Sequence, residues 1–184
     1  DFSHLCAKAE EKGIRIILDG VFSHTGSDSI YFNKYHRYAG DEGAYSNPNS
    51  PYREWFQWEG EHSYKSWWGC SNLPNVCEMN ESYLDYILRD KDAVIKRWLR
   101  LGASGWRLDV ADELPDEFIK ILRREAKKEK SDAVIIGEVW EDASNKTSYG
   151  KMREYLLGDE LDSVMNYPFK DLFIDFILCK KDAK

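Results

Sequence analysis

The chain has 184 residues, of which 26 are Lys or Arg and 33 are Asp or Glu, so its formal net charge at pH 7 is −7. A nucleic-acid-binding chain gathers cations to neutralise phosphates, and this sequence gathers none on a basic face. No apolar run approaches the roughly 20 residues that cross a bilayer. Hydrophobic residues make up 42% and charged residues 32% of the chain, which is typical of a globular domain. We therefore expect neither nucleic acid nor a membrane as a partner.

The four cysteines are too few and too scattered for a disulfide scaffold, although Cys70 and Cys77 are close enough in sequence to pair. They form no CxxC motif, and the four histidines do not stand at zinc-binding spacing from them, so no structural zinc site is expected. Residues 1–6 contain neither an initiator Met nor the pattern of a signal peptide. We expect the chain to begin inside a helix, as a piece of a longer protein, which leaves its compartment open.

Hydrophobic periodicity predicts alternating helices and strands outside the region 25–80. Short, uniformly apolar runs predict strands at 14–18, 105–110, 133–136 and 161–166, and helical spacing predicts helices at 1–12, 82–101, 115–130, 149–157 (weaker) and 169–178. Ser82 is expected to cap the second helix, and Pro115 to open the third. Alternation of this kind predicts βαβ units and a parallel sheet, and apolar strands are expected when both faces of that sheet are covered.

Residues 25–80 break this pattern, since Gly, Pro, Asn and Ser are mixed there with many Tyr and Trp residues. A structureless loop of this length is improbable in a compact domain, so we predict a small inserted subdomain. The expected organisation is a βα segment over 1–24, the aromatic-rich insertion over 25–80 and further βα segments over 81–184.

Polar side chains collect where each predicted strand ends. They are Asp19, Ser23 and His24 after the first strand, Arg107 and Asp109 on the second, Glu138 and Trp140 after the third, and Asn166 and Tyr167 after the fourth. Ligands of parallel α/β folds bind at this edge of the sheet. Because side chains alternate along a strand, Arg107 and Asp109 point to the same face, where the guanidinium can hold the carboxylate ionised and oriented.

Asp109 and Glu138 are 29 residues apart, about one βα unit, which predicts that they lie at the ends of neighbouring strands. Strand backbones are ~4.8 Å apart, so the two carboxyl groups should be separated by roughly 5–6 Å, close to the spacing in retaining glycosidases. That chemistry needs one ionised nucleophile and one protonated acid. Arg107 favours Asp109 as the nucleophile, and Glu138, which has no cation near it in sequence, is expected to donate the proton.

Each of these residues also has a structural interpretation. Asp19 and Asp109 could cap turns after buried strands, and His24 could be a structural histidine. The aromatic residues of the insertion could form its core rather than stack on sugar rings. Glu138 is harder to explain in this way, because an acid directly after a buried apolar strand is costly without a partner or a task. Their joint placement on one rim favours catalysis.

Four segments resemble the conserved blocks of the α-amylase family of glycoside hydrolases. They are Asp19–His24, Gly105–Glu113, Gly137–Trp140 and, more weakly, Leu73–Val76, and their order and spacing agree over essentially the whole chain. The resemblance implies a partial (β/α)8 TIM barrel, about the third to sixth strands, with the inserted subdomain after the first strand present. Glu113 and the segment Met165–Phe169 resemble the neopullulanase and cyclomaltodextrinase group in particular.

The resemblance also implies roles for individual residues. Asp109 would be the nucleophile and Glu138 the acid/base; Arg107 would orient the nucleophile and Asp19 would pair with that arginine. His24 would contact the sugar in the cleaving subsite, and Glu113 and Trp140 are expected to contact substrate as well. Ser23 replaces the Asn that ligates calcium in many relatives, so neither calcium nor any other cofactor or metal site is expected.

The expected function is therefore that of a retaining α-glucan hydrolase acting at α-1,4 and also α-1,6 linkages of α-glucans, maltooligosaccharides or cyclodextrins. The family's third carboxylate follows the seventh strand and is absent from this sequence, so the chain alone is expected to be weak or inactive. The alternative is a non-catalytic glucan-binding or scaffold protein derived from such an enzyme, which would not need Asp109, Glu138 and Arg107 together. Half a barrel has unpaired strand edges, which predicts self-association or a longer chain.

Overall fold

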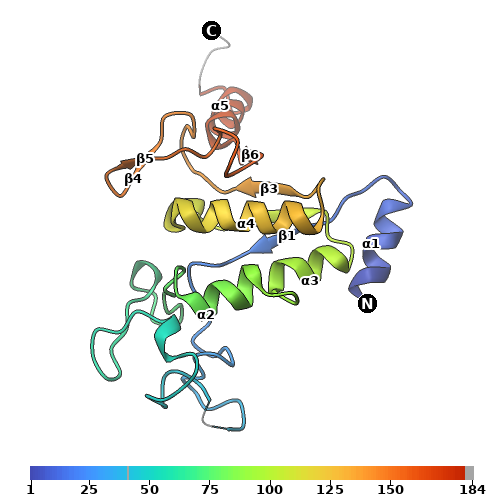
Figure 1. Ribbon diagram of the computed structural model, residues 1–184. Helices are drawn as coiled ribbons and strands as arrows, with labels where there is room; N and C mark the ends of the chain where they lie inside the picture. Colours follow the sequence, from blue (N-terminus) through green and yellow to red (C-terminus); the bar gives the residue numbers. More distant parts are fainter. Residues whose placement is uncertain (41, 181–184) are drawn as a thin grey trace. The chain divides into compact units, whose positions relative to one another are not determined.

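The computed structural model describes residues 1–40 and 42–180, and the chain divides into two compact units (Figure 1). The first, here the sheet unit, consists of residues 1–20 together with the chain from 98 onward. The second, the aromatic unit, consists of residues 21–97. The strand ends that carry the predicted acids belong to the sheet unit.

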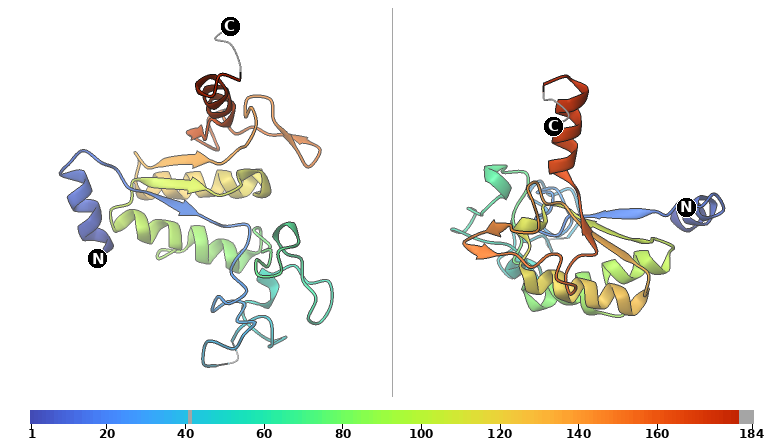
Figure 2. Two further views of the ribbon diagram at one scale, coloured as in Figure 1. Left: turned by 180° about the vertical axis from the view of Figure 1, so that it is seen from behind. Right: turned by 90° about the horizontal axis from the view of Figure 1, so that it is seen from above.

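Four parallel strands form the sheet in the order β1, β2, β3, β6 (Figures 1 and 2). They are β1 (Ile17–Gly20), β2 (Gly105–Leu108), β3 (Val134–Gly137) and β6 (Ser163–Val164). Among the described residues this sheet is open rather than closed, which agrees with the predicted partial barrel. The register pairs Asp19 with Arg107, and Arg107 with Ile136. All four strands therefore end at the same edge.

One face of the sheet packs on α4 (Asp116–Glu129), which lies along it in Figure 2. Pro115 precedes this helix, as predicted, and Phe118 and Leu122 on it are fully buried. Trp106 and Leu108, which alternate with Arg107 along β2, are buried too. The close approach of β2 to β3 requires glycine at 105, because a Cβ there would lie 2.0 Å from the carbonyl oxygen of Val134. This packing sends Arg107 to the opposite face.

The other helices follow their predictions at the two ends of the chain and differ in the middle. They are α1 (Phe2–Glu10), α2 (Glu81–Leu84), the π-helical turn η3 (Asp85–Arg89), α3 (Val94–Arg100) and α5 (Tyr167–Ile177). The side chain of Asp1 accepts the N–H of His4 at 3.1 Å, which satisfies one donor of the first turn of α1.

The single helix predicted over 82–101 is interrupted, and its cap is Asn80 rather than Ser82. The side chain of Asn80 accepts the N–H of Tyr83 at 3.2 Å, which satisfies one of the unpaired donors of the first turn. Asp90 takes an extended ψ of 157° and separates η3 from α3. The sequence did not reveal this break, because apolar residues keep their helical spacing on both sides of Asp90.

The weak helix predicted over 149–157 is wrong. The structure has an antiparallel hairpin there, made of β4 (Thr147–Ser148) and β5 (Lys151–Met152). Tyr149 and Gly150 join the strands with φ of +52° and +76°, the left-handed conformations that a tight hairpin turn requires. The conformation of the two turn residues, and not the spacing of the apolar residues, thus determines the structure of this segment.

Two apolar surfaces of the sheet unit are exposed. Ile17 on β1 lies two residues before Asp19, on the face opposite α4, and is 38% exposed, so the expectation of two covered faces does not hold for this strand. No residue of α5 is buried, and its exposed apolar residues include Phe169, Leu172, Phe173, Ile174, Phe176 and Ile177. In residues 1–40 and 42–180, every helix is too short or too polar to span a bilayer.

Aromatic residues form the core of the aromatic unit, which supports one of the two interpretations of this region. Phe32 is fully buried, and its ring lies 4.7–5.6 Å from the rings of Tyr45, Phe56, Trp58 and Tyr64. Its regular elements are the short 3-10 turns η1 (Arg53–Trp55) and η2 (Trp67–Gly69), besides α2 and η3. All four cysteines are free, so Cys70 and Cys77 are not paired.

Glu160 is a fully buried acid of the sheet unit. Neither carboxylate oxygen has a hydrogen-bond partner, and the Nζ of Lys120 on α4 lies 3.8 Å from Oε1. Burial, together with the nearby negative charge of Asp116, raises the pKa of Glu160 to about 7. The protein therefore loses stability as this acid ionises.

We expect the Glu160→Gln variant to be more stable than the wild type at pH 8 but not at pH 4.5. An acid whose pKa is raised by folding favours the folded state below its unfolded pKa, and this contribution is lost as pH rises through the folded pKa. The window runs from pH ~4.5 to about 7. In thermal unfolding at pH 4.5 and 8, the Tm of the variant should exceed that of the wild type at pH 8 only, by about 2–5 °C. Equal Tm differences at both pH values would contradict this role of Glu160.

Candidate active site

Arg107 links the carboxylates that collect at the edge of the sheet. Its Nη1 lies 2.6 Å from Oδ1 of Asp19 and 2.7 Å from Oδ1 of Asp109, and its Nη2 lies 2.8 Å from Oε2 of Glu138. Burial lowers the pKa of Arg107, but the hydrogen bonds to Asp19 and Asp109 and the charges of Asp19 and Glu138 outweigh this and raise it. One permanently charged guanidinium therefore holds three acids from three neighbouring strands.

The register of the sheet explains this convergence. Asp19 stands directly opposite Arg107, and Arg107 opposite Ile136, so all three side chains project from the same face. Asp109 and Glu138 directly follow β2 and β3, two residues after Arg107 and Ile136, and therefore share that face. Asp109 keeps about a fifth of its side chain exposed and Glu138 about a tenth. Both remain open to a ligand from the carboxyl end of the sheet.

Glu138 accepts from three further donors. The backbone N–H of Val110 donates to Oε2 at 2.9 Å, the hydroxyl of Tyr167 donates to Oε1 at 3.0 Å, and the indole of Trp140 also hydrogen-bonds to the carboxylate. Burial raises the pKa of Glu138, but these bonds and the charge of Arg107 outweigh it, so the pKa of Glu138 is lowered. No cation stands near this acid in sequence, but the sheet brings Arg107 from the neighbouring strand to within 2.8 Å of it.

Val110 holds a strained conformation in order to reach this acid. Its φ of +39° and ψ of +65° lie in the left-handed region, which is costly for a β-branched residue, by about 1–3 kcal/mol. The backbone N–H of Ala111 donates to the carbonyl of Glu138 at 2.9 Å, next to the bond from Val110 to its side chain. The turn after Asp109 is thus fixed to both the backbone and the side chain of Glu138.

Three contacts in the site escaped the sequence-based list of site residues. Tyr167 follows β6, where polar residues were noted, and its hydroxyl reaches Glu138. The sulfur of Met165 lies 3.4 Å from Nε of Arg107. The position of both residues after the fourth strand was a usable signal, whereas the N–H of Val110 had none, because any residue carries such a donor.

The other predicted residues have defined surroundings in their own units. Trp140, 39% exposed, follows β3 in the sheet unit. Glu113, on the 3-10 turn η4 (Ala111–Glu113), accepts the hydroxyl of Tyr149 at 2.7 Å. His24 belongs to the aromatic unit, where it is buried, hydrogen-bonds to the hydroxyl of Ser23 at 3.0 Å and lies 5.4 Å from the ring of Trp67. A contact of these three residues with substrate remains a prediction.

The weak fourth block lies beside Ser23 and His24, the end of the first block, within the aromatic unit. Asn75 bridges to His24, and the N–H of Val76 donates to the carbonyl of Ser23 at 3.1 Å. Among the described residues, no group of three or more His, Cys, Asp or Glu side chains is placed to hold a metal ion. The two blocks therefore form one local structure around His24.

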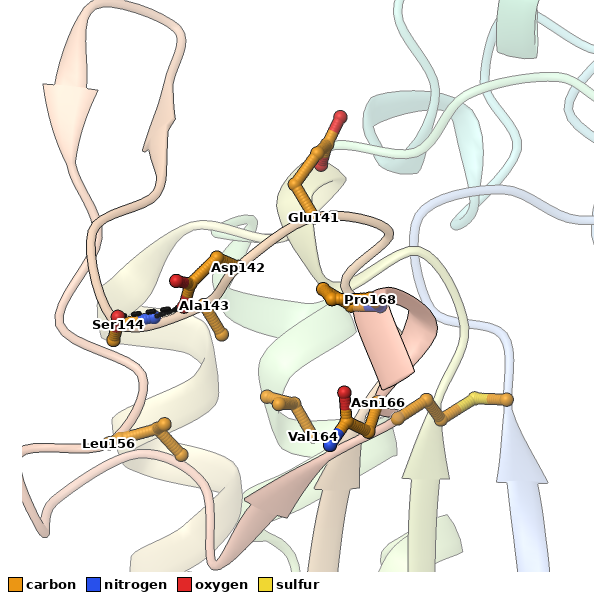
Figure 3. A pocket seen from close by; sticks show the side chains of 9 residues that line it. Glu141, Asp142, Ala143, Ser144, Leu156, Val164, Asn166 and Pro168 are labelled. Carbon is orange, nitrogen blue, oxygen red and sulfur yellow. Dashed lines mark hydrogen bonds between the residues drawn. The ribbon is translucent and has the colours of Figure 1, made fainter. Parts of the chain in front are cut away.

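A pocket of about 270 Å³ opens beside the acids at the carboxyl end of β6 (Figure 3). Residues 141–144, which follow β3, lie across from Val164 and Asn166, and the N–H and hydroxyl of Ser144 donate to Asp142 at 2.9 and 2.7 Å. Met165 lines this pocket and also contacts Arg107, so this residue lies between the pocket and the cluster of acids.

Sequence and structure comparisons place this geometry in a known family. The model of the alpha amylase catalytic domain matches residues 1–182. An amylopullulanase from Thermoanaerobacterium saccharolyticum is 40% identical over 196 residues, which cover 97% of this chain and 14% of that protein. A cyclomaltodextrinase from Thermoanaerobacter pseudethanolicus is 32% identical over 189 residues, covering 96% of this chain and 29% of that protein.

A solved structure of a cyclomaltodextrinase has a TM-score of 0.79 to this chain at 30% identity, covering 97% of this chain and 28% of that one. The chain thus spans less than a third of the length of each of these three relatives. The parallel sheet, the matched blocks and these similarities confirm the predicted resemblance, including that to the cyclomaltodextrinase and neopullulanase group. The chain belongs to the alpha-amylase catalytic-domain family, whose fold is the TIM barrel.

Proposed function

We propose that this chain is part of the catalytic domain of a retaining α-glucan hydrolase, with Asp109 as nucleophile and Glu138 as acid/base. The observation that carries the proposal is the contact of one guanidinium, that of Arg107, with both acids and with Asp19. Acids held this close together suit the short separation of retaining enzymes better than the wider inverting one. A scaffold protein would have no need to gather them.

In the first proposed step, a carboxylate oxygen of Asp109 attacks the anomeric carbon while the glycosidic C–O bond breaks. The leaving oxygen takes the proton of Glu138, so the leaving sugar departs as a neutral alcohol. In the second step Glu138 removes a proton from water, whose oxygen attacks the same carbon and releases Asp109. Two displacements at one carbon retain its configuration. No cofactor takes part in these steps.

Glu138 must hold a proton before the first step, although its pKa is lowered in the free site. Substrate covers the acid and excludes water, which destabilises the carboxylate and raises the pKa. Tyr167 donates to Oε1 and Arg107 contacts Oε2, and both contacts favour the ionised form, so the bound substrate must outweigh them for Glu138 to hold a proton. We infer that the proton is taken up together with the substrate.

The substrate class follows from the relatives. Those named cyclomaltodextrinase and amylopullulanase suggest cyclodextrins, maltooligosaccharides and branched α-glucans, hence α-1,4 and also α-1,6 linkages. We propose that His24, Glu113 and Trp140 contact these sugars. The exposed apolar side chains of α5 and the open sheet suggest that further chain, carrying the third carboxylate, completes the barrel. Without it, hydrolysis should be weak and the open edges should self-associate.

The stereochemistry of the first product tests the reaction type directly. We expect the full-length protein to release α-configured maltose or maltooligosaccharides from a maltooligosaccharide, because two displacements restore the starting configuration. Proton NMR of the anomeric signals within the first minutes, before mutarotation, reads the outcome. β-configured initial products would contradict the retaining mechanism, and binding without turnover would favour the non-catalytic alternative.

A further inference from the structure

Residues 146–155, which include β4 and β5 and are here called the hairpin 146–155, contact the turn that follows Asp109. Five of its side chains contact residues 111–116. Lys146 lies 3.2 Å from Asp112, Tyr149 donates to Glu113 at 2.7 Å, Lys151 pairs with Asp116, Tyr155 donates to Asp112 at 2.5 Å, and Arg153 contacts several groups at once. So many contacts from one hairpin to one turn indicate that the hairpin fixes the turn.

Arg153 makes the central contact. It is 7% exposed, and its guanidinium donates to the carbonyls of Ala111, Asp112 and Leu114 at 3.4, 3.0 and 2.7 Å. Its Nε lies 2.7 Å from Oδ1 of Asp116. The planar fork of a guanidinium can meet this many acceptors in fixed directions, and an ammonium group cannot. Two carbonyls of η4 and that of Leu114 directly after it are therefore held by one buried side chain.

This turn carries the backbone donors to the acid. Val110 and Ala111 donate to Oε2 and to the carbonyl of Glu138, both at 2.9 Å. Val110 does so with its strained φ of +39°, a conformation that persists only where the surroundings enforce it. Arg153 binds the carbonyls directly after this residue and so supplies that enforcement.

We propose that Arg153 is a positioning residue for Glu138, acting through the 110–114 turn that holds the N–H of Val110 on the acid. The inference rests on the proposed function, because it assigns a role toward the proposed acid/base. Arg153 touches neither acid. Its effect on the reaction passes entirely through the backbone of the turn.

The Arg153→Lys variant of the full-length protein tests this inference. Lysine keeps the charge beside Asp116 but loses the fork that binds the carbonyls, so we expect kcat to fall by about 10- to 100-fold with little change in KM. Weakening the bond from Val110 also raises the pKa of Glu138, so the basic limb of the pH profile of kcat/KM should move up by about one pH unit or less. A purely structural role would lower the amount of active enzyme without moving that limb.

Two further variants keep the test decisive if Arg153→Lys folds poorly. Tyr155→Phe keeps the buried ring and removes only the hydroxyl that binds Asp112, so it should fold and shift the limb in the same direction by less. Arg123→Lys is the matched control. Arg123 lies on α4 and pairs with Asp162 at 2.7 Å, and it does not contact the turn. The pH profile of this variant should match that of the wild type.

The outcomes separate this inference from the proposed function. If Glu138→Gln abolishes hydrolysis while folded Arg153→Lys and Tyr155→Phe both keep the kcat and pH profile of the wild type, the positioning role is overturned and the acid/base assignment stands. If Glu138→Gln keeps activity, the proposed function itself fails. A shifted basic limb in Tyr155→Phe with an unchanged Arg123→Lys control supports the positioning role.

Discussion

Replacing Asp109 with Asn in the full-length protein is expected to reduce kcat for maltooligosaccharide and cyclodextrin hydrolysis by roughly a thousandfold or more, the scale on which nucleophile losses act. The amide has nearly the shape of the carboxylate but cannot form the glycosyl ester. Arg107 would still pair with Asp19 and Glu138, so the edge of the sheet should stay assembled. Initial rates at saturating substrate, with Tm as a check of folding, measure the effect.

The matched control for this substitution is Asp132→Asn. Asp132 is also an acid of the sheet unit paired with an arginine, since its Oδ2 lies 2.6 Å from Arg15, but it is exposed and not among the clustered acids. Its variant should hydrolyse both substrates at the wild-type rate. A folded Asp109→Asn variant that retains most of its activity would remove Asp109 as the nucleophile.

The Glu138→Gln substitution should lower kcat on maltooligosaccharides by about 100- to 10,000-fold, the usual contribution of general acid catalysis. Its effect should depend on the leaving group. From α-maltosyl fluoride the leaving group is a fluoride ion, which departs without a proton. The first step on this substrate therefore needs no acid and should proceed at close to the wild-type rate. Asp109→Asn, by contrast, should fail on both substrates, since the nucleophile is needed whatever leaves.

Two measurements check this contrast. Fluoride release in the first turnover reports the first step, and steady-state hydrolysis of maltooligosaccharide reports the reaction that needs the proton. Glu125→Gln is the control. Glu125 is a buried acid of α4 that pairs with Lys128 at 2.8 Å and is not one of the acids that Arg107 contacts. Equal losses for Glu138→Gln on the two substrates would be incompatible with a proton donor at this position.

Much of the sheet unit could be predicted from the sequence because its rules are local. Apolar runs gave β1, β2 and β3, and the spacing of apolar residues with Pro115 before them gave α4. The hairpin 146–155 could not be predicted from apolar spacing, since two left-handed residues at its turn decided it. Asn80 replaced Ser82 as a cap for a similar reason, because either residue offers a side-chain acceptor and only the backbone geometry chooses.

The site divides in the same way. Alternation along β2 placed Arg107 and Asp109 on one face, and the count of one βα unit placed Glu138 near them. The contact of Arg107 with Glu138 depends on the register between strands, which the sequence of a single strand does not contain. Burial raises the pKa of Glu138, but the hydrogen bonds from Val110, Trp140 and Tyr167, together with the charge of Arg107, outweigh it and lower the pKa in the free site. Contacts that depend on the strand register therefore keep Glu138 ionised in the free site. In the proposed mechanism, the acid takes its proton only when substrate binds.

The most direct measurement is the site of the covalent intermediate. In the Glu138→Gln variant, α-maltosyl fluoride should form the glycosyl-enzyme but release it slowly, because the base that activates water is gone. Mass spectrometry of the protease-digested protein should then find one maltosyl group on the peptide that contains Asp109. A maltosyl group on the peptide that carries Asp19, or turnover of the fluoride with no adduct and inverted product, would contradict the assignment of Asp109 and Glu138.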